Sequence, residues 1–149
     1  MSAISITICT ERNKEKVIKK LASIHSTRKF LRFKPIEFMR KIKHGNVEPS
    51  LIVIENLREY LSPPIADVTL RSDLLGLLIR YIKMLPGNTI ILFSVLRMET
   101  DPLHYILYIS IGGDRKIEMP VLGFNDKKTR NLAHFLGIKP YKDLIIVNI

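Results

Sequence analysis

The pattern of hydrophobic and polar positions along the first third of the chain predicts a strand and a helix, followed by a second strand and a second helix. Residues 4–10 alternate between apolar and polar side chains and are rich in β-branched residues, which is typical of a strand. Residues 12–25 repeat apolar side chains every three or four positions, with lysines between them, and so predict an amphipathic helix. The pattern recurs with a short strand at 30–33 and a helix over 35–45, which opens on a proline.

Longer apolar runs dominate the middle of the chain. Residues 51–54 are continuously apolar, as expected of a strand that is covered on both faces. A loop over 57–69 leads into a helix over 70–85. This helix is apolar nearly all round, so we expect it to be largely buried. Residues 89–93 predict another buried strand.

The last third of the chain predicts strands that are no longer separated by helices. Residues 105–111 and 116–122 flank a glycine turn and predict an antiparallel hairpin. A short helix over 127–136 and a last strand over 144–149 follow. We therefore expect one α/β domain over residues 1–149, in three layers, with a mostly parallel central sheet and a C-terminal antiparallel hairpin.

The composition is that of a globular chain in a reducing compartment. Apolar residues make up 46% of the sequence and charged residues 26%, which excludes a disordered chain. No apolar run approaches the roughly 18 residues that cross a bilayer, and the first ten residues lack the pattern of a secretion signal. Cys9 is the only cysteine, so neither an internal disulfide nor a cysteine-based zinc site is expected. These features favour a cytoplasmic protein, and the lack of Gln together with abundant Lys favours an archaeal, thermophilic source.

The net charge of +10 is concentrated in the first fifty residues. They hold 12 Lys/Arg against 4 Asp/Glu, or +8, while residues 51–149 hold 12 against 10, or +2. Seven cations fall within sixteen positions, opposed only by Glu37: Arg28, Lys29, Arg32, Lys34, Arg40, Lys41 and Lys43. A one-sided positive field attracts polyanions, so this segment is predicted to bind nucleic acid. The alternative is a solvated face of a thermophilic protein.

Side chains that often carry catalysis form no complete motif. The four histidines are spread along the chain: His25, His44, His104 and His134. None has a second histidine or a cysteine three or four positions away, so we expect no metal site. A serine in a glycine-flanked elbow is also absent. The acidic pairs Asp73 with Glu55 and Glu118 with Asp114 leave a small metal-dependent nuclease as an alternative.

Several segments, in their order along the chain, are similar to those of a known family. Residues 6–12 predict a strand that ends in an acidic residue after a threonine, and residues 49–56 predict a buried strand that ends in Glu55-Asn56. A long helix over 74–85 leads into a strand that ends in Ser94, and a hairpin follows. This order resembles the core of the RecA/RadA recombinases over nearly the whole chain. The resemblance implies a RecA-like fold.

The family's phosphate-binding loop, GxxxxGK[ST], is absent from the sequence. Such a loop needs glycines so that backbone N–H groups can cradle phosphates. The closest segment, residues 10–17, has Thr10 and Glu15 at the two glycine positions and Val17 at the hydroxyl position. We therefore expect a truncated core without the family's central phosphate-loop strand, which would lie beside residues 51–54, and without ATPase activity or a cofactor.

The resemblance also implies roles for residues at the ends of strands. The family residue that matches Glu11 positions the hydrolytic water, the one that matches Glu55 holds the metal, and Ser94 matches a polar sensor. Without a bound nucleotide, these become degenerate ATPase positions. From the sequence alone, Glu11 is interpreted as an anion at a helix N-terminus and Glu55 as a strand-end acid paired with an arginine.

Two further segments match the loops that grip DNA in recombinases, and they contain three arginines: Arg58, Arg71 and Arg97. The resulting expectation is a non-ATPase accessory protein of DNA recombination or repair. Its expected partners are single- or double-stranded DNA and a recombinase, a paralogue or a second copy of the chain. The alternative of a different class is a protein-interaction module that does not bind nucleic acid.

Overall fold

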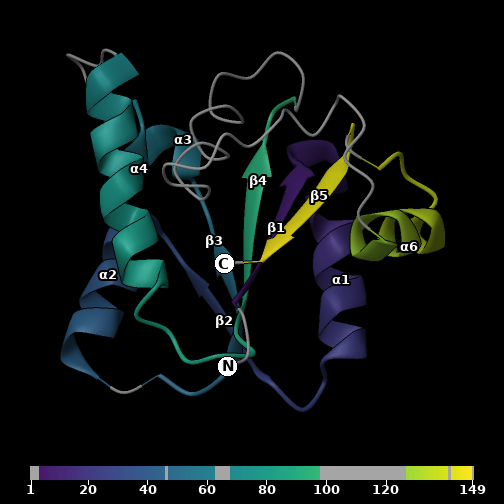
Figure 1. Cartoon of the computed structure of the whole chain (residues 1–149), viewed down its shortest axis with the longest axis horizontal. Helices are drawn as coiled ribbons and strands as arrows, with labels where there is room; N and C mark the ends of the chain where they lie inside the picture. Colours follow the sequence, from purple (N-terminus) through teal and green to yellow (C-terminus); the bar gives the residue numbers. More distant parts are fainter. Residues whose placement is uncertain (1–3, 46, 63–67, 98–126, 141, 149) are drawn as a thin grey trace.

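The computed structural model describes residues 4–45, 47–62, 68–97, 127–140 and 142–148. Its five strands form one sheet: β1 (Ser5–Thr10), β2 (Lys29–Phe33), β3 (Ser50–Ile54), β4 (Ile90–Val95) and β5 (Leu144–Asn148). The strand order is β2-β3-β4-β1-β5 (Figure 1). The first four strands are parallel, and β5 pairs antiparallel with β1 at one edge. The predicted α/β fold with a mostly parallel sheet is therefore confirmed.

Helices cover both faces of this sheet. They are α1 (Lys14–Ile24), which follows a 3-10 turn η1 (Glu11–Asn13), α2 (Pro35–His44), the short α3 (Leu57–Tyr60), α4 (Val68–Ile82) and α6 (Lys127–Leu136). In Figure 1, α1 and α6 lie on one side of the sheet, and α2 and α4 lie on the other. The first crossover, from β1 to β2, passes over one face, and the crossovers through α2 and α4 return over the opposite face.

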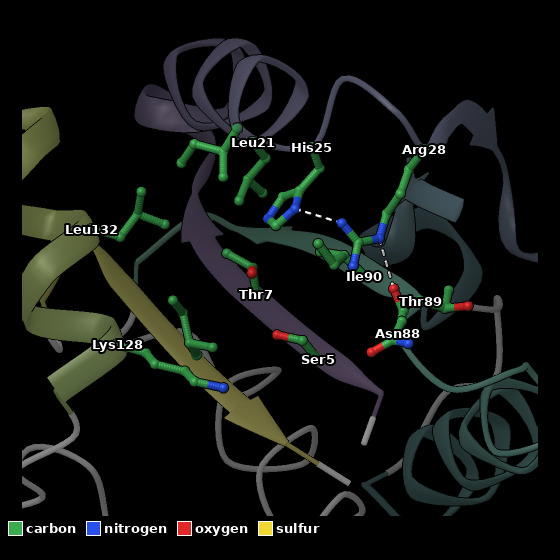
Figure 2. Close-up of a pocket in the computed structure, with 12 residues that line it drawn as sticks. Ser5, Thr7, Leu21, His25, Arg28, Asn88, Thr89, Ile90, Lys128 and Leu132 are labelled. Carbon is green, nitrogen blue, oxygen red and sulfur yellow. Dashed lines mark hydrogen bonds between the residues drawn. The ribbon is translucent and has the colours of Figure 1, made fainter. Parts of the chain in front are cut away.

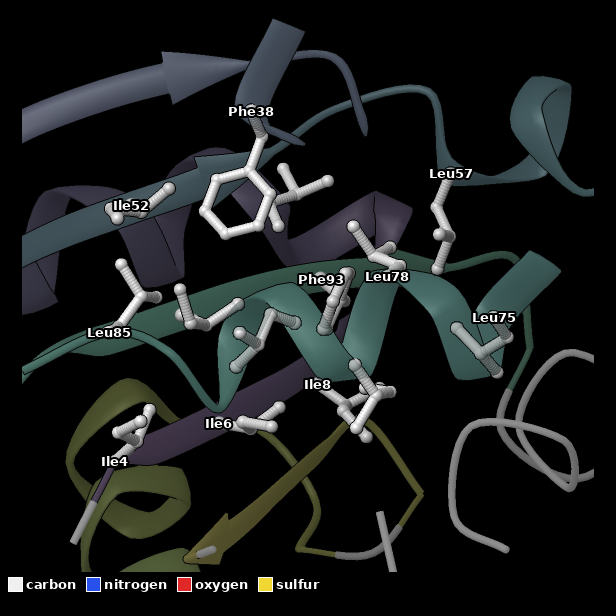
Figure 3. Close-up of a cluster of buried hydrophobic side chains, with 14 of the residues drawn as sticks. Ile4, Ile6, Ile8, Phe38, Ile52, Leu57, Leu75, Leu78, Leu85 and Phe93 are labelled. Carbon is white, nitrogen blue, oxygen red and sulfur yellow. The ribbon is translucent and has the colours of Figure 1, made fainter. Parts of the chain in front are cut away.

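The core is divided by the sheet into two clusters. Alternation along β1 sends Ile6 and Ile8 to the face of α2 and α4, and it sends Cys9 to the face of α1 and α6. The larger cluster includes Phe38 of α2 and Phe93 of β4, both fully buried (Figure 3). Both faces of β3 are buried, which explains why its sequence is a continuous apolar run.

Most of the predicted elements lie where the pattern placed them, within one or two residues, and the differences have physical reasons. The expected loop over 57–69 contains the helical turn α3, and α4 begins at Val68. The helix predicted over 70–85 is less buried than expected, because Leu77 remains 42% exposed. An outer helix packs on the sheet with one face only. The hairpin predicted over 105–122 lies outside the described residues.

The sheet has no gap where the resemblance implied a lost strand. β3 pairs with β2 on one side and with β4 on the other, in continuous register. β4 pairs in turn with β1, which occupies a central position and is itself paired on both sides. The described strands therefore satisfy the backbone groups of the sheet interior without a partner chain. No helix in the described part of the chain is long and apolar enough to cross a membrane.

Candidate functional site

The carboxyl ends of the parallel strands carry the residues that the recombinase resemblance singles out. Glu11 follows β1 in the turn η1, where its side chain is exposed, and Glu55 directly follows β3. Ser94 lies in β4, half-buried and in register with Cys9 of β1. In open α/β sheets, ligands commonly bind at this edge, so its geometry decides what the chain can hold.

The connection from β1 to α1 is a closed helical turn rather than an open loop. The buried side-chain amide of Asn13 donates a hydrogen bond of 2.8 Å to Thr10 Oγ1 within this turn. Two carboxylates, Glu11 and Glu15, stand in or next to the turn, and both are exposed. A turn that is filled by its own side chains and lined by anions is unsuited to cradling phosphates.

Glu55 is the centre of an ion-pair cluster that joins α1 to the carboxyl ends of β2 and β3. Arg32 Nε donates to Glu55 Oε1 at 2.7 Å, and a terminal Arg32 nitrogen lies 3.3 Å from Oε2. The same guanidinium donates to Glu15 Oε1 at 3.2 Å, and Lys14 Nζ lies 3.8 Å from Glu55 Oε2. Two cations and two carboxylates sum to zero charge, so the cluster pins the start of α1 without forming a positive patch.

These contacts change the acid–base behaviour of both central groups. Hydrogen bonds from Arg32, and after them its charge, hold the pKa of the Glu55 carboxyl below its ordinary value, against the opposing effect of partial burial. The same hydrogen bonds to Glu55 and Glu15 raise the pKa of the Arg32 guanidinium. The Glu55 carboxylate is therefore ionised, and both of its oxygens accept hydrogen bonds from Arg32. A metal ion could bind it only by displacing Arg32.

The Glu55 cluster makes a pH-dependent contribution to stability. Because the Glu55 pKa is lowered in the folded state, the contribution is present above the pKa of the unfolded chain and is lost as the pH falls through the folded value. We expect Glu55→Gln to lower the free energy of unfolding by about 0.5–1 kcal/mol at pH 7, since water screens these part-exposed groups. The difference should shrink toward zero at pH 3. Urea unfolding at both pH values measures it, and Glu48→Gln, an exposed carboxylate outside any described ion pair, is the control. A pH-independent loss for Glu55→Gln would contradict the ion-pair interpretation.

The ten basic residues predicted to bind nucleic acid do not lie on one surface. Arg40, Lys41 and Lys43 are exposed on α2, and Lys34 precedes its first turn. Lys29 is exposed on β2, the edge strand beside α2 (Figure 1). These five residues form a group on the β2–α2 side of the molecule.

The other five basic residues are separated from that group or are already engaged. Arg32 belongs to the neutral Glu55 cluster. Arg28 lies at the amino edge of the sheet, where Nε donates to the Asn88 carbonyl at 2.9 Å. Arg58 on α3 and Arg97 after β4 are exposed near the carboxyl edge. The side chain of Arg71 lies outside the described part of the chain.

A pocket that the sequence did not predict lies at the amino edge of the parallel strands, between α1 and α6 (Figure 2). Its volume is about 480 Å³. Of the described residues, twelve line it: Ser5, Thr7, Leu21, Ile24, His25, Arg28, Asn88, Thr89, Ile90, Lys128, Leu132 and Ile146. They come from five separate elements, the connection after α1 and the turn before β4, so no local motif could have indicated the pocket.

The described residues offer no metal site, and similarity to known proteins does not indicate a function. Within the described residues, no group of three or more His, Cys, Asp or Glu side chains is placed to hold a metal ion. The acidic pair of Glu118 and Asp114 lies outside those residues, and Asp73 is exposed in the second turn of α4. Comparison with protein-family models, with curated proteins and with solved structures gives no match to this chain.

Proposed function

We propose that this chain binds nucleic acid through the α2 basic surface, defined as Lys29, Lys34, Arg40, Lys41 and Lys43, and that it acts as a non-ATPase accessory protein of DNA recombination or repair. The observation that carries the binding proposal is the exposure of these cations. Within the described part of the chain, none of the five side chains has an ion-pair partner. Unpaired surface cations are the groups that neutralise phosphates and release counterions.

The arrangement of β2 and α2 supports a continuous surface. Leu31 and Phe33 of β2 pack toward the cluster beneath α2, and Lys29 shares their side of the strand by alternation. A crossover helix returns along the sheet, so the last turn of α2, with Lys41 and Lys43, lies at the end where β2 begins. Cations in a last turn also complement the helix dipole, but this explanation does not apply to Lys29 on the strand.

The carboxyl edge supports the non-ATPase part of the proposal. The turn after β1 is closed by Asn13 and flanked by carboxylates, and Glu55 is held by Arg32 and Lys14. A recombinase or a paralogue as protein partner is inferred from the resemblance in element order alone. Saturable ATP binding or ATP turnover by the purified chain would contradict this part of the proposal. Magnesium-dependent cleavage of DNA that is lost in Asp73→Ala would favour the nuclease alternative.

Removal of four charges from the α2 basic surface tests nucleic-acid binding. We expect a variant with Lys29, Arg40, Lys41 and Lys43 changed to Gln to bind DNA about tenfold to a hundredfold more weakly at 100 mM salt, because phosphates that are no longer neutralised keep their counterions. Its plot of log affinity against log salt should be flatter by about 0.9 for each phosphate of duplex DNA that the variant leaves unneutralised. Fluorescence anisotropy with single- and double-stranded oligonucleotides, over a range of salt, measures both quantities.

The matched control removes the same charge from the opposite side of the sheet. Lys16 and Lys19 on α1, and Lys139 and Lys142 before β5, are all exposed. We expect their change to Gln to leave affinity within about threefold of the unmodified chain. Equal losses of affinity in the two quadruple variants would show a mere net-charge effect. Undetectable or salt-independent binding would instead favour the protein-interaction module.

A further inference from the structure

The pocket between α1 and α6 combines an apolar wall with hydrogen-bond donors. Leu21 of α1, Leu132 of α6 and Ile146 of β5 form apolar parts of its lining. Ser5 and Thr7 come from the face of β1 that carries Cys9, and Figure 2 shows both side chains along β1. A volume of about 480 Å³ lies within the range of small-molecule sites.

The rim of the pocket contains a fixed guanidinium and a histidine of defined tautomer. Arg28 is held at Nε by the Asn88 carbonyl, and one terminal nitrogen lies 2.6 Å from His25 Nδ1 (Figure 2). A guanidinium can only donate, so Nδ1 accepts and the ring proton is on Nε2. Burial, and after it the charge of Arg28, lowers the pKa of His25, which agrees with this neutral form.

The charged and polar groups of the lining therefore present mainly donors. Arg28 and Lys128 carry positive charge, His25 presents an Nε2–H, and Ser5 and Thr7 present hydroxyls. Among the described residues that line the pocket, none is Asp or Glu. A ligand that satisfies these groups carries several acceptor oxygens and negative charge, and the remaining lining requires an apolar body.

We propose that this pocket binds a small organic anion, in which a carboxylate or phosphate headgroup is attached to an apolar body. The headgroup lies near Arg28 and Lys128, and the body lies against Leu21 and Leu132. The site is independent of the α2 basic surface, since it is built on the α1 and α6 face of the sheet.

Four probes separate the two parts of this recognition. Phenyl phosphate and 3-phenylpropionate carry both parts, inorganic phosphate carries the charge alone, and phenol carries the apolar ring alone. We expect the first two to bind the full chain with Kd of about 1 mM or lower, at least about tenfold more tightly than either partial probe. NMR titration with the His25 ring signals as the readout measures each Kd, and the ratio of the two amphipathic anions identifies the preferred headgroup.

Matched variants locate the binding. Leu132→Trp fills the pocket and should weaken phenyl phosphate at least tenfold, whereas Leu77→Trp, on the exposed side of α4, should leave it unchanged. Lys128→Gln adds no bulk, and it should weaken phenyl phosphate at least threefold but not phenol. The quadruple α2 variant should retain full binding, which keeps this result separate from the nucleic-acid test.

Several outcomes would overturn the proposal. Inorganic phosphate that binds as tightly as phenyl phosphate would indicate general attraction of anions to a basic protein. Phenol that binds equally well would indicate an apolar hole without headgroup recognition. Unchanged affinity in both Leu132→Trp and Lys128→Gln would place the binding outside the pocket.

Discussion

Thiol reagents at pH 8 are expected to modify Cys9 at least about a thousandfold more slowly in the native protein than in the unfolded chain. Cys9 is 0% exposed in the middle of the sheet, in register with Ser94 of β4 and Leu144 of β5. Burial raises the pKa of its thiol to about 12, and the smaller effects are a lowering by the charge of Lys14 and a further rise from the charge of Glu11. An unfolded thiol has a pKa of about 8.5, so unfolding supplies both access and the reactive thiolate.

The single cysteine makes this measurement unambiguous. Labelling with a chromogenic disulfide reagent is followed in native buffer and in guanidinium chloride at a concentration that unfolds the chain, and Cys9→Ser gives the background. Ser23→Cys, on the exposed side of α1, is the matched control and should react rapidly in native buffer. Labelling of Cys9 at nearly its unfolded rate would contradict the central, paired position of β1.

The dependence of the labelling rate on denaturant adds information about β5. This strand lies at an edge of the sheet and pairs only with β1 among the described strands. If Cys9 is exposed through global unfolding, its slow labelling should accelerate steeply with guanidinium. A slow rate that is insensitive to denaturant would indicate local detachment of β5 and α6.

Elements with strong local patterns could be predicted from the sequence. Alternation over 4–10 reflects one strand with two different covered faces, and the apolar run over 51–54 reflects a strand buried on both. The run over 51–54 records the burial of each residue, whereas the alternation over 4–10 indicates the strand but not its full burial, because the polar Thr7 and Thr10 are buried as well. The edge strand β2 was also predicted, because its aromatic and aliphatic residues remain β-favouring even where they are half-exposed.

Strand order and ion pairing could not be predicted in the same way. The pairing of β1 with both β4 and β5 joins residues more than 80 positions apart, and nothing in the local pattern encodes it. The sequence suggested an arginine partner for Glu55, and the structure identifies it as Arg32. Lys14 and Glu15 also belong to the Glu55 cluster. Their contacts depend on how α1 lies across the sheet, so the spacing of these residues in the sequence does not predict them.

The basic residues predicted to bind nucleic acid lie in different places in the fold for a related reason. A run of cations in the sequence mixes side chains from a turn, a strand and a helix, and these elements face different directions. Arg28 serves the amino-edge pocket and Arg32 serves the Glu55 cluster, while Arg40, Lys41 and Lys43 remain exposed on α2. Charge density along the chain therefore indicates a basic region, but it does not indicate which of its side chains are held in other contacts.

The exposed cations of α2 depend on the side chains that attach this helix to the sheet. Phe38 is 0% exposed, lies near Ile52 of β3 in Figure 3, and its ring centroid is 6.4 Å from that of Phe33. We expect Phe38→Ala to lower the free energy of unfolding by about 3–5 kcal/mol, since it removes buried apolar area and leaves a cavity. Guanidinium unfolding followed by circular dichroism measures the loss.

Phe135→Ala is the matched control for this prediction, because it makes the same substitution in another helix. Phe135 of α6 is 68% exposed, and Lys20 Nζ lies 3.2 Å from its ring centroid. A cation–π contact at such a site contributes about 0.5–1 kcal/mol, so the expected loss of stability stays at or below about 1 kcal/mol. Equal losses of stability in the two variants would contradict the packing of α2 against β3. If the core also positions the α2 basic surface, Phe38→Ala should weaken DNA binding at temperatures near its lowered unfolding midpoint, whereas Phe135→Ala should bind as the unmodified chain does.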